Sequence, residues 1–170
     1  MMKLNLLMNG TDVRAGYDNI DGFPDLPNNQ EFSDEKIKGD VLNLDWHTED
    51  DTCDEIVAIH VLNTCFLGQI GRVLSNWVKK LKKGGTLTIG STDLKEIAKN
   101  IQYDVLPFEE SVMRMFGQQK VGIWDLHKNS FTVPILRNML EQNGLTVTKT
   151  RLSNYSIVME AVKGYVPNNV

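Results

Sequence analysis

The fold is decided by residues 56–90, IVAIHVLNTCFLGQIGRVLSNWVKKLKKGGTLTIG. The apolar run at 56–59 is typical of a parallel strand covered on both faces. The apolar residues that follow have the spacing of one helix face and predict a helix: Phe66, Ile70, Val73, Leu74, Trp77 and Leu81. The lysines after it are expected to complement the carboxyl end of that helix: Lys79, Lys80, Lys82 and Lys83. Gly84-Gly85 is predicted to stop the helix before a second strand at 86–90, which indicates a parallel α/β sheet.

Towards the N-terminus, two short strands are predicted. The run at 3–8 reads as a strand that ends in a sharp turn at Asn9-Gly10, and residues 17–21 form the second strand. The prolines and polar residues of 22–38 predict a loop with room for one helical turn. Residues 40–44 are predicted to form a brief third strand.

Beyond the central unit, residues 102–129 are predicted to form an insertion over the sheet edge or the mouth of a site. A helix follows at 135–140, with Thr132 as its cap, Pro134 in its first turn and an end at Gly144. Two strands, 145–152 and 156–162, are close enough to form an antiparallel hairpin. The expected architecture is a mostly parallel α/β sheet closed by this C-terminal hairpin.

The composition of the chain argues against a nucleic-acid-binding, membrane or metal-binding protein. The chain has 170 residues, 18 Lys and Arg against 22 Asp and Glu, and a net charge of -4, so we expect one domain over 1–170 and no nucleic-acid or membrane partner. No apolar run approaches a membrane span, and the first residues lack the features of a signal peptide. Cys53 and Cys65 show no metal-ligand or disulfide spacing. These features predict a cytoplasmic protein without a metal site.

The order of elements and several local strings resemble the class I S-adenosylmethionine-dependent methyltransferases, most closely their small type-11-like branch, which is often associated with sugar or glycan modification. The matching strings cover nearly the whole chain: Gly10-Thr11, Gly16 to Asp21, Gly39-Asp40-Val41, Asp54 to Leu62, Trp77, Leu81 to Leu87, Phe116-Gly117, His127-Lys128, Phe131 and Leu140 to Leu145. The resemblance implies a Rossmann-like, doubly wound sheet and S-adenosylmethionine as the cofactor. The ligand would then lie beyond the carboxyl ends of the strands.

Cofactor-binding positions follow from the resemblance. Asn9-Gly10 would form the first cofactor turn, and Asp21 would accept hydrogen bonds from the ribose hydroxyls. Asp40 and Val41 would border the adenine, and His60 would lie under the cofactor near the methyl acceptor. Each position also has a structural interpretation: a tight turn at Gly10, a turn cap at Asp21, a solvated loop carboxylate at Asp40, and a buried structural histidine at His60.

The implied acceptor is a small molecule or a saccharide, methylated on oxygen or nitrogen. His127 and His60 are the candidate catalytic residues. His127 is a candidate base because a neutral imidazole can take the proton of an acceptor hydroxyl, although it could instead pack the insertion onto the sheet. Asp93 could face the acceptor or cap a helix that begins at Leu94. An apolar stripe could form an acceptor pocket, core, or an oligomer contact such as a homodimer: Phe108, Met113, Met115 and Phe116.

Two departures from the family pattern favour a second hypothesis. Met8 and Asn9 stand where the branch has a glycine and a small residue, and Asn63-Thr64 replaces its Glu-His. Both changes fall at the implied cofactor site, and overpacking there costs about 1–3 kcal/mol. The alternative is therefore a catalytically inactive binding or assembly protein with the same fold. A nicotinamide-dependent enzyme is disfavoured because the first loop lacks G-x-G-x-x-G.

Overall fold

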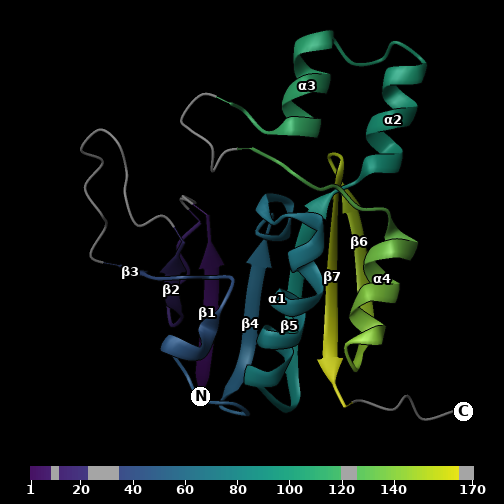
Figure 1. Cartoon of the computed structure of the whole chain (residues 1–170). Coiled ribbons are helices and arrows are strands. Elements are labelled where there is room, and N and C mark those ends of the chain that lie inside the picture. Colours follow the sequence, from purple (N-terminus) through teal and green to yellow (C-terminus); the bar gives the residue numbers. More distant parts are fainter. Residues whose placement is uncertain (9–11, 23–34, 120–125, 165–170) are drawn as a thin grey trace, which may run out of the picture.

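A computed structural model of the chain describes residues 1–8, 12–22, 35–119 and 126–164. Its strands form one sheet in the order β3-β2-β1-β4-β5-β7-β6 (Figure 1). β1 to β5 are paired in parallel, and β7 runs antiparallel to both β5 and β6. The strands are β1 Met2–Leu7, β2 Asp18–Asp21, β3 Lys36–Lys38, β4 Cys53–Ile59, β5 Leu81–Thr92, β6 Leu145–Ser153 and β7 Ser156–Lys163. The predicted, mostly parallel sheet with a C-terminal antiparallel hairpin is confirmed.

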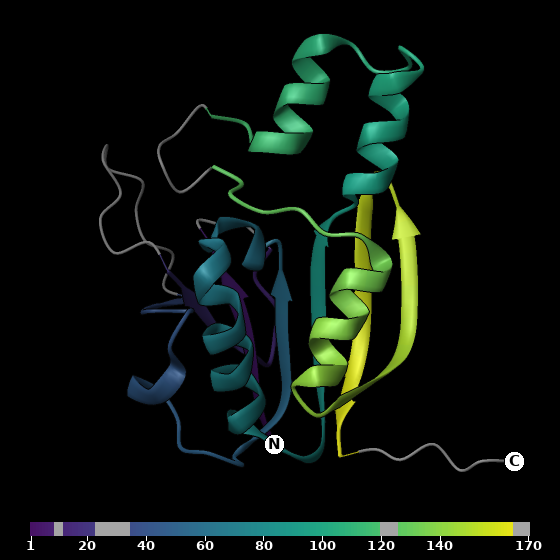
Figure 2. The same ribbon diagram turned by 45° about the vertical axis from the view of Figure 1, so that its right-hand side comes forward.

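The helices occupy two places. α1 (Ile70–Lys80) and α4 (Val133–Gln142) cover the same face of the sheet, whereas α2 (Leu94–Gln102) and α3 (Phe108–Phe116) stand beyond the carboxyl ends of the parallel strands (Figure 1; Figure 2). Three short 3₁₀ helices complete the described part: η1 Leu44–Trp46, η2 Leu62–Thr64 and η3 Leu67–Gln69. Among the described residues, no helix has the length and apolarity needed to cross a membrane.

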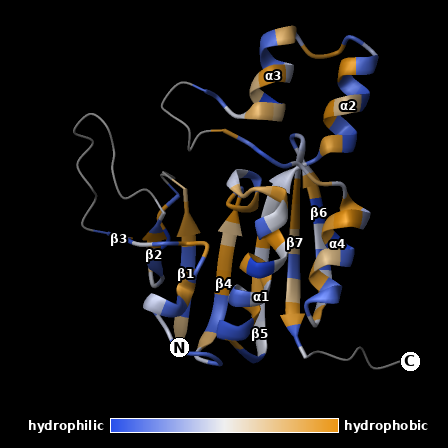
Figure 3. Ribbon diagram, in the orientation of Figure 1, coloured by the Kyte–Doolittle hydropathy of each residue, from blue (hydrophilic) through white to orange (hydrophobic). Residues whose placement is uncertain are grey.

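The core lies between α1, α4 and the central strands. Ile56, Val57 and Ala58 of β4 are fully buried, as their continuous apolar run predicts. Trp77 of α1 is buried in the same core cluster as Ile56 and Ala58, and its indole Nε1 donates a hydrogen bond to the carbonyl oxygen of Val41 at 2.8 Å. α3 also carries apolar residues although it stands away from the core (Figure 3). Phe108 at its start is 77% exposed, so the predicted apolar stripe is not core there.

The ends of α1 differ from the prediction. Phe66 precedes the helix and is exposed, because η3 separates it from Ile70. The helix stops at Lys80, and Gly84-Gly85 lies inside β5 instead of at the helix end. Here the pairing of β5 with β4 jumps from Leu81 to Thr86, and Gly84 takes a φ of +82°. The two glycines therefore permit an irregular strand entry.

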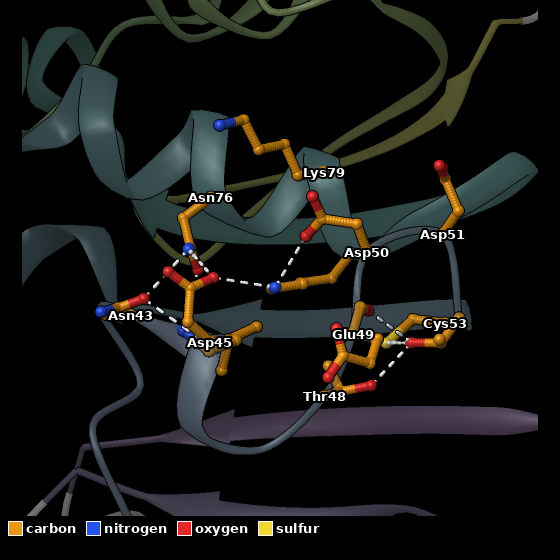
Figure 4. Close-up of polar contacts among 12 residues, drawn as sticks. Asn43, Asp45, Thr48, Glu49, Asp50, Asp51, Cys53, Asn76 and Lys79 are labelled. Atoms are coloured by element: carbon orange, nitrogen blue, oxygen red, sulfur yellow. Dashed lines mark hydrogen bonds and ion pairs between the residues drawn. The ribbon is translucent and has the colours of Figure 1, made fainter.

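Lys80 has a different role from the predicted one of complementing the helix end. Its side chain is buried, and its ammonium lies 2.8 Å from an Asp45 oxygen and 2.7 Å from an Asp50 oxygen. Asn76 donates to Asp45 as well, at 3.0 Å (Figure 4). The hydrogen bond from Lys80 is the main cause of a lowered pKa at Asp45. This network ties α1 to the segment before β4, at the amino ends of the strands.

The predicted third strand at 40–44 is wrong: β3 is Lys36–Lys38, and a turn follows it. The reason is a turn closed by Asp40, whose Oδ1 accepts a hydrogen bond from the Leu42 backbone at 2.8 Å. The chain folds back so tightly that a Cβ added at Gly39 would lie 1.8 Å from the Trp46 ring. The rest of the loop predicted at 22–38 falls mostly on residues 23–34, outside the described residues.

The C-terminal elements follow the prediction closely. Thr132 precedes α4, a proline lies in its first turn, and Gly144 with a φ of +80° follows its end. The hairpin register runs from Leu145 opposite Lys163 to Ser153 opposite Ser156. Asp93 caps α2, as its structural interpretation requires, because its Oδ1 accepts hydrogen bonds from the first-turn backbone nitrogens of Lys95 and Glu96.

Candidate functional site

A cavity of about 500 Å³ lies where β4 and β5 end, beside α3 and the β6–β7 turn. In doubly wound sheets this edge is where ligands bind. The strand ends contribute His60 and Thr92, and α3 contributes Met113 and Arg114. Both faces of the cavity therefore come from elements that are far apart in the sequence. Further lining residues are His127 and the turn residue Tyr155.

The cavity brings together the two candidate catalytic residues. The rings of His60 and His127 are nearly parallel, with an interplanar angle of 9° and centroids 6.1 Å apart. His60 immediately follows β4 and takes a φ of +60°, a conformation that is uncommon outside glycine. Its backbone nitrogen still donates to the carbonyl oxygen of Gly90 at 2.9 Å, so the strand pairing continues through this residue. The turn is thus fixed by the sheet, and it points the ring into the cavity wall.

The environment of His60 favours a neutral imidazole. Burial lowers the pKa of His60, and the nearby charge of His127 lowers it further. Nδ1 of His60 is buried, so Nε2 is the nitrogen that remains to face the cavity. A neutral ring with an accessible nitrogen can accept a proton.

The lowered pKa of His60 predicts a pH effect on stability. In the unfolded chain a histidine titrates near 6.5, whereas the folded protein holds the His60 pKa below that value. Between these two pKa values the unfolded state binds more protons, so the free energy of unfolding falls as the pH drops below about 6.5. We expect this decrease to be shallower in His60→Gln, measured by urea unfolding across pH 5 to 8. Identical pH dependence in the two proteins would contradict the assignment.

Contacts between α3 and the β6–β7 turn form one wall of the cavity. The Arg114 guanidinium lies over the Tyr155 ring, 4.0 Å from its centroid, and also forms a salt bridge with Glu110 one turn earlier on α3. Tyr155 and Asn154 both have positive φ, which sets the tight turn between β6 and β7. The hairpin turn and α3 therefore hold each other in place through a cation–π contact.

The residues predicted to bind the cofactor lie at the neighbouring strand ends. Asp21 closes β2 and is only 2% exposed, and its Oδ2 lies 3.1 Å from the Lys36 ammonium. Val41 is buried, and Asp40 is exposed with its carboxylate in the turn described above. Asn9 and Gly10 lie outside the described residues. The structure thus places Asp21 and Val41 near β1 and β2, and His60 with His127 near β4.

Met8 lies at the centre of this neighbouring region. A Cβ added at Gly22 would come within 2.8 Å of the Met8 sulfur and 2.9 Å of a Val41 methyl carbon. The thioether of Met8 therefore packs against the residue after β2 and near Val41. A larger residue at position 22 would displace the Met8 side chain. Met8 stands where the resemblance expects open space.

Comparisons with known proteins agree with this architecture. No family model matches the chain. An uncharacterised methyltransferase of Bacillus cytotoxicus is 30% identical over 130 residues, which cover 74% of this chain and 55% of that protein. The chain thus spans about half the length of this relative. A solved S-adenosylmethionine-dependent methyltransferase from Methanosarcina mazei superposes with a TM-score of 0.61 at 15% identity, covering 95% of this chain and 92% of its own.

The predicted resemblance to class I methyltransferases is confirmed. A second solved structure of this fold is the 1,6-didemethyltoxoflavin N1-methyltransferase of Burkholderia thailandensis, with its substrate and S-adenosylhomocysteine bound. Its TM-score is 0.58 at 15% identity, with 96% of this chain and 72% of that chain covered. The type-11-like branch and the individual site roles stay predictions.

Three residues of this methyltransferase-fold site were not predicted from the sequence. Arg114 and Tyr155 meet only through the tertiary structure, and nothing in their local sequence indicates a contact. Asn63 differs from the branch pattern, and it is fully buried and bonded to the segment that follows His127. Its place four residues after the end of β4 is the signal in the sequence that points to the ligand-binding edge.

Proposed function

We propose that this chain transfers a methyl group from S-adenosylmethionine to a small-molecule acceptor held in the cavity at the ends of β4 and β5. The proposal depends on the position of His60. This residue lines the cavity at the ligand-binding edge of the sheet, and its imidazole is neutral with a buried Nδ1. A small heterocyclic substrate in the structural neighbour from Burkholderia thailandensis is consistent with an acceptor of that size. Saccharides remain within the same class of acceptor.

The described residues fit the cofactor with one adjustment. Asp21 would accept hydrogen bonds from the ribose hydroxyls, and Asp40 and Val41 would border the adenine. The carboxylate stands at the required strand end and is already buried, so little ordering is needed. Met8 obstructs the space next to it, but its unbranched side chain can rotate away. When bound, S-adenosylmethionine supplies a methyl group that its sulfonium has already activated.

The protein then has two tasks. The walls of the cavity would hold the acceptor atom against the transferable methyl group, and such positioning lowers the barrier by several kcal/mol, at most about 7–11 kcal/mol. Nε2 of His60 would take the proton that the acceptor oxygen or nitrogen loses on methylation, and the cofactor would leave as S-adenosylhomocysteine when its methyl–sulfur bond breaks. A proton on this ring is stabilised less than usual because the ring is buried and faces His127. It is therefore released readily once product has left.

Binding of the cofactor product tests the proposal. Isothermal calorimetry with S-adenosylhomocysteine should show one site, and at 100 times the dissociation constant the ligand should stabilise the protein by about 2.7 kcal/mol. Formation of S-adenosylhomocysteine can then be followed with panels of amines, phenols and sugars. If neither S-adenosylmethionine nor S-adenosylhomocysteine binds, the proposed methyltransferase activity is wrong.

A second candidate function is supported by Met8. If its thioether fills the cofactor space permanently, the chain is a binding or assembly protein that keeps the fold without the chemistry. The contact with Gly22 and Val41 supports this reading, because it occupies the region between the proposed ribose and adenine positions.

The two functions differ in what Met8→Ala should do. If Met8 obstructs the cofactor, its removal should increase the affinity for S-adenosylhomocysteine by about 5- to 150-fold, which corresponds to about 1–3 kcal/mol of overpacking. Met2→Ala is the matched control, since Met2 is a partly buried methionine at the other end of β1. Micromolar binding by the wild type together with weaker binding by Met8→Ala would make Met8 part of the cofactor site and remove the support for an inactive protein.

A further inference from the structure

Asn63 holds the segment that carries His127. It lies in η2, just after β4, and its side chain is fully buried. Its backbone carbonyl oxygen accepts hydrogen bonds from the backbone nitrogens of Lys128 at 2.6 Å and Asn129 at 3.1 Å. In return, the Asn129 amide donates to the carbonyl oxygen of Cys65. The segment at 128–129 is thus tied to the turn after β4 by backbone and side chain together.

The side-chain amide of Asn63 extends this connection to β5. Its Nδ2 donates to the carbonyl oxygen of Asn129 at 2.7 Å and to the hydroxyl of Thr92 at 2.8 Å. Because a backbone carbonyl can only accept, these contacts fix which end of the amide is the nitrogen. Thr92 continues the chain of hydrogen bonds to the Ser130 hydroxyl at 2.8 Å. Both amide hydrogens of Asn63 are therefore used, and its oxygen points elsewhere.

Nδ1 of His60 can satisfy that oxygen. Oδ1 of Asn63 and Nδ1 of His60 are both buried, and neither has a hydrogen-bond partner among the described residues. The side chain of Asn63 raises the pKa of His60, which means that it stabilises the protonated ring. An acceptor oxygen beside a buried ring nitrogen has this effect, and a hydrogen bond between the two would satisfy both atoms.

We propose that Asn63 is a positioning residue for the two histidines. It clamps 128–130 across the ends of β4 and β5, so that the His127 ring lies parallel to His60, and its carboxamide oxygen keeps the proton of neutral His60 on Nδ1. Nε2 then carries the lone pair that faces the cavity. The consequence for catalysis rests on the proposed function, whereas the tautomer and the ring arrangement do not.

Position 63 needs an amide for both tasks. A carboxylate would keep the acceptor for His60, but it would set an oxygen against the carbonyl oxygen of Asn129 and add a negative charge beside the ring. An aliphatic side chain would lose the clamp and the acceptor together. Of these side chains, only the amide supplies two donors to the clamp and a neutral acceptor to the imidazole.

Nitrogen-15 NMR of histidine-labelled protein tests the proposal without cofactor. In the wild type, neutral His60 should show protonated Nδ1 and unprotonated Nε2, with a nuclear Overhauser contact between the His60 and His127 rings. Asn63→Ala should lose the preference for protonated Nδ1 and weaken the ring contact. Asn63→Asp should raise the pKa of His60 above its wild-type value, because a carboxylate favours the protonated ring.

Asn5→Ala is the matched control. Asn5 is a buried asparagine in β1 whose Nδ2 also donates two hydrogen bonds, to the Asp12 carbonyl oxygen and to Asn19 Oδ1, both at 2.8 Å. Its loss should reduce stability but leave the His60 and His127 signals in place. Protonated Nε2 on neutral wild-type His60 would overturn the proposal even if neither variant at position 63 folds. Unchanged His60 tautomer and pKa in the folded variants would overturn it as well.

These outcomes are separate from those of the proposed function. A chain that binds no S-adenosylhomocysteine can still show the expected His60 tautomer. Equally, a working methyltransferase with the other tautomer would retain the function and reject the role of Asn63.

Discussion

Replacing His60 with glutamine is expected to lower the rate of the proposed methyl transfer by about 100-fold or more, while binding of S-adenosylhomocysteine is retained. General bases contribute about 10²- to 10⁴-fold to the reactions they serve, and Nε2 of His60, which lines the cavity, is the proposed base. Glutamine keeps a polar side chain in the cavity wall but cannot accept a proton at neutral pH. The measurement is single-turnover formation of S-adenosylhomocysteine at saturating cofactor.

His47→Gln provides the control for this prediction. His47 is hydrogen-bonded to Asp18, its Nε2 lying 3.0 Å from the carboxylate oxygen, and this pair lies at the start of β2, away from the cavity. Its replacement should leave the rate unchanged. A His60→Gln protein with the wild-type rate would place the base elsewhere, and His127→Gln would then be the decisive variant.

The sequence predicts correctly those parts of the fold that depend on residues close together in the chain. The apolar run at 56–59, the glycine after α4 and the C-terminal hairpin each act within a few residues, and all three are confirmed. The failures occur where another contact outweighs the local pattern. The segment 40–44 begins with a turn that the hydrogen bond from the Leu42 backbone to Asp40 closes, and α1 ends early because β5 pairs with β4 from Leu81 onward.

The candidate site shows the same division. His60 and Asp21 could be selected because each directly ends or follows a strand, and the carboxyl ends of parallel strands share one edge. That His127 joins His60 could not be predicted, because the contact depends on hydrogen bonds between Asn63 and residues 128–129. The contact of Arg114 with Tyr155 likewise requires α3 to return over the hairpin turn. Neither contact can be predicted from the residues next to it in the sequence.

Asp21→Asn is expected to weaken binding of S-adenosylhomocysteine by about 10- to 150-fold, because a hydrogen bond to a charged group is worth about 1.5–3 kcal/mol. The change keeps the volume of the side chain and removes the charge that would accept from the ribose hydroxyls. Asp18→Asn is the control, since Asp18 begins the same strand and pairs with His47. Calorimetry gives the affinities, and thermal unfolding shows whether the folded state survives the loss of the Lys36 ion pair.

The result also decides how Met8 is to be understood. If Asp21→Asn weakens binding and Met8→Ala strengthens it, both residues act on one ligand: Asp21 holds it, and Met8 must move aside to admit it. If Asp21→Asn binds as tightly as the wild type, the carboxylate serves only the ion pair with Lys36 and the end of β2. The cofactor would then lie elsewhere along the strand ends, and the contact of Met8 with Gly22 would be ordinary packing.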